Sequence, residues 1–222
     1  MKMNFKKITL IIALATVGAF SAKAQISVGL TGGFATGMDL ANPMSGSSDP
    51  KKLASDNGFG GGLTGRYWLN DNMAVGLNVS YFSFGVKDVP SGITSSYSIM
   101  PISLAFDYYF MDEGFKPFAG LEVGYLSCSW LAKYPADYKG GGNPAFDVSY
   151  TNNGLFLAPV IGAAYGLNDN FDILLNAKYV LGLNGGKQDF KYSISGIPST
   201  QSDAIASSFV NINLGVSYKF GN

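Results

Sequence analysis

The sequence has no histidine and only one cysteine, Cys128, among its 222 residues. Serine hydrolases use a histidine base, so an enzyme built on this chain would need an unusual lysine or carboxylate base. One cysteine cannot form an intramolecular disulfide, and without histidine it cannot complete a common zinc site. We therefore expect no catalytic residues, no cofactor and no bound metal.

Charge is also scarce. Charged residues make up 14% of the chain, against roughly 25% in soluble proteins, whereas aromatic residues make up another 14%. Loss of the first 24 residues, which contain four lysines, would leave 11 basic and 15 acidic side chains, a net charge of −4. This balance argues against nucleic acid as a partner, because nucleic-acid-binding domains carry a basic face.

Long apolar runs are absent after the N-terminus. Three lysines precede an apolar run over residues 8–20, and Ala22-Lys23-Ala24 fits an A-x-A cleavage site, so residues 1–24 are predicted to be a signal peptide. The mature chain, residues 25–222, would then form one domain. It contains no stretch of about 18 uninterrupted apolar residues, which excludes ordinary transmembrane helices.

The last strand carries the strongest pattern in the sequence. Apolar and polar residues alternate over residues 210–220, and the polar positions include Asn211, Asn213 and Lys219. A period of two gives the strand one apolar and one polar face. Lipid outside and a polar lumen inside accommodate both faces, and a closed transmembrane β-barrel provides that arrangement.

Eight segments fit strands that cross a bilayer. They are expected over 26–36, 59–68, from 73, ending at 110, from about 117, and over 155–167, 171–181 and 210–220. The segment 155–167 is apolar on both faces, which leaves its phase open. Pro101 and Pro159 lie within strands and predict bulges, because proline removes a ladder donor.

The connections alternate between short and long. Turns at 69–72, 111–116 and 168–170 are rich in Asn, Asp and Gly, whereas the connections expected over 37–58, 87–96, 131–153 and 183–205 are long. Outer-membrane barrels have short periplasmic turns and long extracellular loops. The predicted fold is therefore an all-β, eight-stranded antiparallel transmembrane up-and-down β-barrel with both termini in the periplasm.

Aromatic residues mark two heights on these strands. Tyr81, Tyr125 and Tyr179 each lie eight residues beyond the start of their strand, which is a climb of roughly 20 Å at a tilt of ~40°. These tyrosines are expected to form an upper aromatic girdle. The expected lower girdle consists of Tyr67, Tyr108, Phe110, Phe171, Tyr218 and Phe220.

The chain resembles the small eight-stranded outer-membrane β-barrel family, the OmpA-transmembrane, OmpX and OmpW-like group. The resemblance is carried by Ala22-Lys23-Ala24, by the strand Pro117–Tyr125 and by Val216-Ser217-Tyr218-Lys219-Phe220. It implies a monomer in the Gram-negative cell outer membrane, in contact with outer-membrane lipid. It also implies that the barrel-assembly machinery reads the C-terminal strand ending at Phe220, although Gly221 and Asn222 follow it.

Six charged residues fall on inward strand positions, namely Arg66, Asp107, Glu122, Asp172, Lys178 and Lys219. Three are basic and three acidic, so the lumen as assigned is neutral. Lys219 and Asp172 lie near the periplasmic ends of adjacent strands and are expected to pair, and Glu122 and Lys178 lie at one height. Because an eight-stranded barrel is only wide enough for side chains to fill, we interpret these residues as a structural plug. A gated polar channel is the other interpretation.

Two roles remain open at this point. The first is a structural or surface-interaction role through the extracellular loops, in particular residues 134–144, which mix aromatic and flexible polar residues. The alternative is a conduit for small, apolar molecules, in the manner suggested for OmpW-like barrels. A secreted soluble β-sandwich is a third reading. The sequence does not identify an extracellular ligand.

Overall fold

The computed structural model describes residues 25–39, 55–86, 89, 91–137, 144–183, 188–192, 199–201 and 207–220. The ten strands are β1 (Ile26–Asp39), β2 (Ser55–Asn70), β3 (Met73–Val86), β4 (Thr94–Tyr109), β5 (Phe115–Tyr134), β6 (Phe146–Gly166), β7 (Phe171–Gly182), β8 (Gln188–Tyr192), β9 (Ser199–Gln201) and β10 (Ser208–Phe220). In this part of the chain, no helix has the length and hydropathy needed to cross a membrane.

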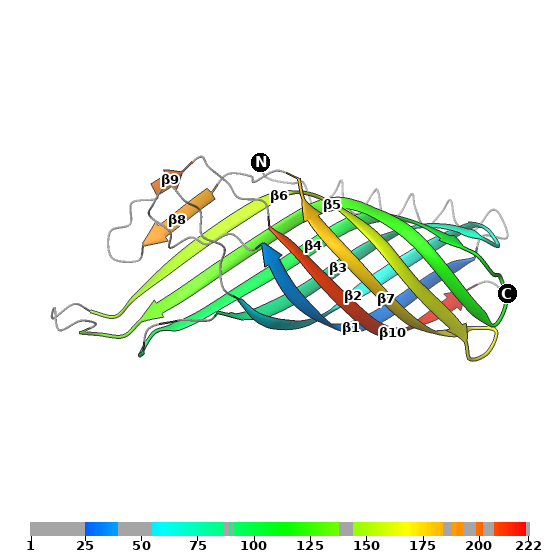
Figure 1. Cartoon of the computed structure of the whole chain (residues 1–222), viewed down its shortest axis with the longest axis horizontal. Helices are drawn as coiled ribbons and strands as arrows, with labels where there is room; N and C mark the ends of the chain where they lie inside the picture. Colours follow the sequence, from blue (N-terminus) through cyan, green and yellow to red (C-terminus); the bar gives the residue numbers. More distant parts are fainter. Residues whose placement is uncertain are drawn as a thin grey trace.

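Eight of these strands close into an antiparallel barrel. The hydrogen-bonded order is β5-β4-β3-β2-β1-β10-β7-β6, and pairing between β5 and β6 closes the ring. The predicted eight-stranded barrel is thus confirmed. Short turns join β2 to β3, β4 to β5 and β6 to β7 at the end where β10 finishes (Figure 1). We call this the turn end and the opposite end the loop end.

The connections expected at the loop end are partly strand. Pairing between β5 and β6 continues without a break from Phe115↔Tyr165 to Tyr134↔Phe146, far into the segment that we expected to be a loop over 131–153. The reason is that inward apolar residues such as Trp130 and Tyr150 keep alternating, so the ladder continues around a common core. In the expected connection over 183–205, β8 pairs with β6, and β9 pairs with β8.

The predicted bulges at Pro101 and Pro159 do not occur. Pairing between β6 and β7 omits Pro159, but the register is the same at Leu157↔Leu181 as at Val160↔Lys178. Pairing between β3 and β4 omits Pro101 in the same way. Each proline removes ladder hydrogen bonds on one side only, since its other neighbour pairs normally. The register shifts lie elsewhere, at strand ends such as that between Trp68 and Asn70.

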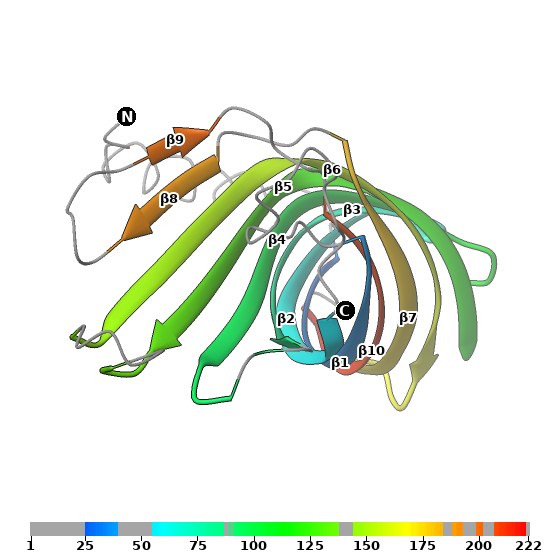
Figure 2. The ribbon, with the colours of Figure 1, turned by 60° about the vertical axis from the view of Figure 1, so that its left-hand side comes forward.

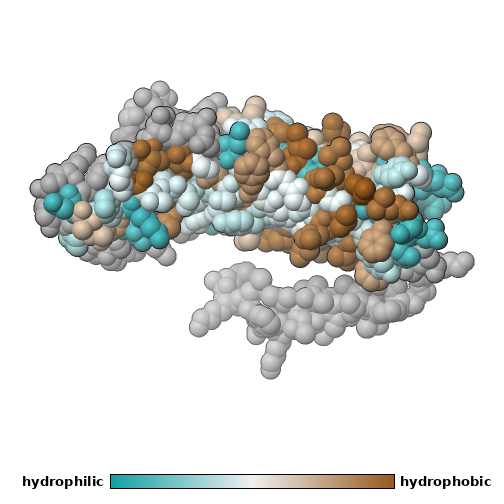
Figure 3. All heavy atoms as spheres, turned by 90° about the horizontal axis from the view of Figure 1, so that it is seen from below, coloured by the Kyte–Doolittle hydropathy of each residue, from teal (hydrophilic) through white to brown (hydrophobic). Residues whose placement is uncertain are grey.

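An apolar surface surrounds the barrel. Figure 3 shows apolar residues along the wall, most densely in the half toward the turn end, and hydrophilic residues at both ends of the face. The upper-girdle tyrosines Tyr81, Tyr125 and Tyr179 are all exposed on this surface. The phase of β6, which the sequence left open, is also settled, because Phe156 and Val160 point inward while Leu155 and Ile161 point outward.

Candidate functional site in the barrel lumen

Polar side chains fill the half of the lumen nearer the turn end. Strand alternation turns Asn211, Asn213 and Ser217 of β10 inward, and it does the same for Asp107 of β4 and Glu122 of β5; all five are buried. Buried polar groups need hydrogen-bond partners to offset their lost hydration. These side chains are therefore expected to hydrogen-bond to one another in a connected network.

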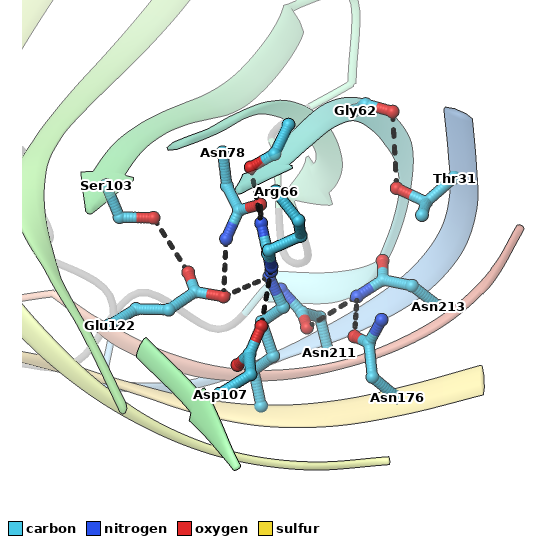
Figure 4. A network of polar contacts seen from close by, with 12 residues as sticks. Thr31, Gly62, Arg66, Asn78, Ser103, Asp107, Glu122, Asn176, Asn211 and Asn213 are labelled. Atoms are coloured by element: carbon cyan, nitrogen blue, oxygen red, sulfur yellow. Dashed lines mark hydrogen bonds and ion pairs between the residues drawn. The ribbon is translucent and has the colours of Figure 1, made fainter. Parts of the chain in front are cut away.

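Glu122 is the centre of this network (Figure 4). Its Oε1 accepts hydrogen bonds from Lys178 Nζ at 2.6 Å and from Asn78 Nδ2 at 2.7 Å, and its Oε2 accepts one from Ser103 Oγ at 2.8 Å. The four side chains come from β5, β7, β3 and β4, so the contacts cross the lumen instead of following one strand pair. Glu122 is 3% exposed, which makes this a fully buried and fully partnered carboxylate.

Arg66 extends the network toward the turn end. Its Nε donates to Asp107 Oδ2 at 2.5 Å, and its Nη1 donates to Asn78 Oδ1 at 2.7 Å. Asn78 therefore links the Arg66–Asp107 ion pair to the Glu122–Lys178 ion pair. Each of the two ion pairs is neutral, because it joins one basic and one acidic side chain. Buried charges in a low-dielectric lumen need such pairing.

Two glycines make room for the Arg66–Asp107 pair. A Cβ at Gly120 would collide with Asp107 Oδ1, and a Cβ at Gly76 would collide with the backbone of Gly65 and with the Arg66 side chain. Glycine lets other groups approach the backbone closely inside a narrow barrel. The glycines are thus part of the site geometry.

Asp172 forms a second centre at the turn end. Lys116 Nζ and Lys219 Nζ each lie 3.0 Å from Asp172 Oδ2. Lys116 comes from β5 and Lys219 from β10, on either side of β7. One carboxylate therefore holds two ammonium groups. Among the described residues, four basic side chains in the lumen face the three acids Asp107, Glu122 and Asp172.

Asparagines connect the wall of β7 and β10. Asn213 Nδ2 donates to Asn176 Oδ1 at 2.9 Å and to Asn211 Oδ1 at 3.0 Å. Between this cluster and the two ion-paired centres lies a cavity of about 30 Å³, lined by residues that include Arg66, Glu122 and Asn176. One water molecule needs roughly 10–15 Å³ of such a cavity. The cavity therefore has room for about two waters and is too small for a solute.

Comparison with known proteins fits this geometry. The sequence matches the family described as outer membrane protein beta-barrel domain over residues 10–220. The chain belongs to that family. It lies in the Gram-negative outer membrane, where its outer face contacts lipid. No curated protein matches the chain.

Solved structures show the same fold for this outer-membrane barrel. It is similar to a major outer membrane protein from Thermus thermophilus, with 15% identity, a TM-score of 0.63, and 89% of this chain and 99% of that chain covered. OprG from Pseudomonas aeruginosa shares 19% identity at a TM-score of 0.54, with 88% and 96% covered. Neisserial surface protein A shares 16% identity at a TM-score of 0.50, with 90% and 98% covered.

The loop-end half of the barrel interior differs from the expected polar lumen. Its core is apolar and aromatic, with the large side chains Phe82, Phe84, Tyr97, Trp130, Tyr150, Phe156 and Phe209 in one buried cluster. Cys128 is 1% exposed within this cluster. We expected a polar interior throughout, and that expectation is wrong for this half.

The turn end is closed by a smaller aromatic group. The rings of Trp68 and Tyr109 lie 4.6 Å apart, and those of Tyr109 and Phe118 lie 5.0 Å apart. Below them opens a mouth of about 360 Å³, lined by the turn carboxylates Asp71, Asp112, Glu113 and Asp169 and by Lys116 and Lys219. The described residues contain no group of three or more Cys, Asp and Glu side chains placed to hold a metal ion.

The structure brings all six charged residues named from the sequence into the lumen, as three ion pairs. The Lys219–Asp172 pair was expected from the sequence, and Lys178 and Glu122 were expected at one height. The sequence assigned no partner to Arg66 or Asp107, which pair with each other. Sequence reasoning missed Lys116, which we had placed in the turn over 111–116. Its position, six residues before Glu122 on β5, has the inward parity, and that parity was the available signal.

Proposed function

We propose that the chain is a non-enzymatic, monomeric surface protein whose barrel holds an extracellular extension for binding. The supporting observation is the filled lumen. Ion pairs cross it around Glu122 and Asp172, the aromatic core fills the loop-end half, and a second buried cluster with Tyr109 and Phe118 packs near the turn end. A wall of eight strands leaves little space beyond that of its own side chains. The lumen residues are thus structural in this proposal.

The part that would meet a partner is the extension, by which we mean β3, β4, β5 and β6 beyond the level where β7 leaves β6. β5 and β6 remain paired as far as Tyr134↔Phe146, whereas β7 leaves β6 at Phe156↔Gly182. Figure 2 shows β4, β5 and β6 continuing beyond the shorter strands. At the tip, the rings of Tyr134 and Phe146 stack 4.5 Å apart with an interplanar angle of 5°. Loops held by a rigid scaffold commonly carry binding.

A deletion at the tip tests this role. Residues 135–145 would be replaced by a two-residue turn, and cells displaying either protein would be applied to an array of glycans and extracellular-matrix proteins. The proposal expects at least one array component to bind wild-type cells and to be lost with the tip. Equal binding by both cell types, at equal amounts of folded protein, would contradict it.

A conduit for small apolar molecules is the second candidate, and the apolar loop-end core favours it. Planar bilayers separate the two roles. The surface role expects no discrete conductance steps and no faster entry of an apolar dye into vesicles. Step-like openings, or dye entry that Lys178→Met changes, would favour the conduit.

Assembly and export complete the proposal. The exposed Phe220 ends β10, and its ring lies 4.7 Å from that of Tyr218, so an aromatic signal is available to the barrel-assembly machinery. Phe220→Ala is expected to lower the amount of assembled protein several-fold, while Phe110→Ala, at a girdle position outside this strand, is not.

Cleavage after Ala24 remains a prediction that the mass of the mature chain tests; residues 1–24 lie outside the described residues.

A further inference from the structure

The outward face of the extension carries an array of hydroxyl groups. Ser83↔Ser98, Ser98↔Ser129 and Ser129↔Thr151 are register pairs, so four hydroxyl-bearing residues form one row across β3, β4, β5 and β6. Ser96 and Ser149 lie in the next row out, and Ser127 lies in the row below. We call these seven residues the hydroxyl face.

This face points away from the barrel interior. The residues between its members in sequence, such as Tyr97, Cys128 and Tyr150, belong to the buried aromatic core, and alternate residues of a strand lie on opposite sides of the sheet. The seven residues are exposed or half-buried. Among the described residues, one of these hydroxyls hydrogen-bonds to protein, with Ser98 Oγ donating to Ser129 O at 3.5 Å. The array is therefore available to an external partner.

Its height on the barrel identifies that partner's layer. The row Val79–Ile102–Tyr125–Leu155 is wholly apolar and exposed, and the row Ser83–Ser98–Ser129–Thr151 lies four residues further along the same strands. At ~3.3 Å per residue and a tilt of ~40°, this separation is roughly 10 Å. Each polar head-group layer adds roughly 5–8 Å to the hydrocarbon core. The row of Ser127, about 5 Å above the apolar row, thus lies within the head-group layer, and the row Ser83–Ser98–Ser129–Thr151 lies at the outer edge of that layer.

Its chemistry fits sugar. From the apolar row up to the row of Ser96 and Ser149, every described outward position on these four strands is uncharged. Charge enters at the edge of the array, where Asp189 and Lys191 of β8 pair in register with Thr151 and Ser149 and offset each other, and one row further out, at Lys133 and Asp147. A serine or threonine hydroxyl offers one donor and two acceptor sites, which matches a neutral polyol. The exposed rings of Tyr81 and Tyr125 flank the array on its membrane side. Acidic or phosphate groups would instead call for Lys or Arg.

We propose that the hydroxyl face binds the saccharide head groups of outer-leaflet glycolipid. Binding there fixes how the extension stands on the membrane and leaves its tip for a surface partner. The inference rests on the outer-membrane location and not on the surface role, so it holds equally if the barrel is a conduit.

The test removes the hydroxyls and keeps the shape. The quadruple variant S83A/S98A/S129A/T151V and the wild-type chain would be titrated in detergent with lipopolysaccharide carrying its core sugars and with phosphatidylglycerol. Thr36→Val, on β1 in the opposite wall, is the matched control. We expect the quadruple variant to bind lipopolysaccharide roughly tenfold more weakly, as the loss of a few neutral hydrogen bonds implies. Phosphatidylglycerol binding should not change.

Three results would overturn the proposal. Unchanged lipopolysaccharide binding, or equal losses for both lipids, would remove the sugar contact. A change in oligomeric state by light scattering would show instead that the face joins two copies of the chain. Heat-dependent gel mobility checks folding, and if the quadruple variant fails to fold, S98A/T151V provides the same test with an expected loss of about threefold.

Discussion

Lys178 of β7 reaches across the neighbouring strand to Glu122 of β5, with Nζ 2.6 Å from Oε1. The two strands do not pair, because β6 lies between them. Val160 of β6 pairs with Lys178 in register and has a smaller side chain, so the lysine can extend over it. The ion pair thus ties together three strands of the wall.

Removing one partner of this ion pair should lower the free energy of unfolding more than the replacement of both partners would suggest. Glu122→Ala leaves the Lys178 charge buried, and it should lower the free energy of unfolding by about 3–5 kcal/mol. The double variant E122Q/K178M should lose less than the sum of the single variants E122Q and K178M, because no unpaired charge remains. Urea titrations in phospholipid vesicles measure these differences. The exposed turn variant Glu113→Gln should change nothing, and additive losses would contradict the account.

Asp172 should matter more than either of its lysines. Asp172→Asn would leave Lys116 and Lys219 facing each other without a counter-charge, whereas Lys219→Met leaves Asp172 paired with Lys116. The expected order of stability is wild type, then Lys219→Met, then Asp172→Asn. Urea midpoints at low and high salt check the order. Equal midpoints for the two variants would show that the shared carboxylate is not the centre of this cluster.

Gly120→Ala should destabilise the barrel by about 1–3 kcal/mol, because its Cβ would overlap Asp107 Oδ1 and displace the Arg66 ion pair. Gly65→Ala is the matched control, since a Cβ there meets nothing within 4 Å. Thermal unfolding of both variants is the measurement. Similar losses at the two positions would rule out the packing argument.

A charge on the outer face should be penalised according to its depth. Leu104 is 62% exposed in the middle of the apolar surface, so Leu104→Arg should cost about 2–4 kcal/mol in a bilayer. Ser98→Arg, in the hydroxyl face beyond that surface, should cost at most about 1 kcal/mol. Unfolding free energies in vesicles test this pair, and equal costs would argue against a lipid layer at Leu104.

Much of this structure was readable because strand alternation is local. On β10 the period of two assigns Leu214 outward and Asn213 inward from the sequence alone, and the turn composition then gives the strand order of an up-and-down barrel. Residues on one face at one height, such as Glu122 and Lys178, could be paired by counting from the turns.

The loop-end core was not readable in the same way. Tyr97, Trp130 and Tyr150 lie in segments where the outward residues are serine and threonine, so an apolar-outside pattern breaks down and the segments look like loops. Their inward burial depends on long-range closure of β3 to β6 around a common core. Lys116 was missed for a different reason, since we treated a residue beside a turn as part of the turn.

Labelling along β10 tests the central arrangement most directly. With Cys128→Ser as background, single cysteines at Asn213, Leu214, Val216 and Ser217 would each carry a nitroxide label in vesicles, and collision with oxygen, which partitions into lipid, would be measured. We predict high oxygen accessibility at 214 and 216 and low accessibility at 213 and 217. The reverse order, or equal values at all four positions, would contradict a barrel with lipid outside and a polar lumen inside.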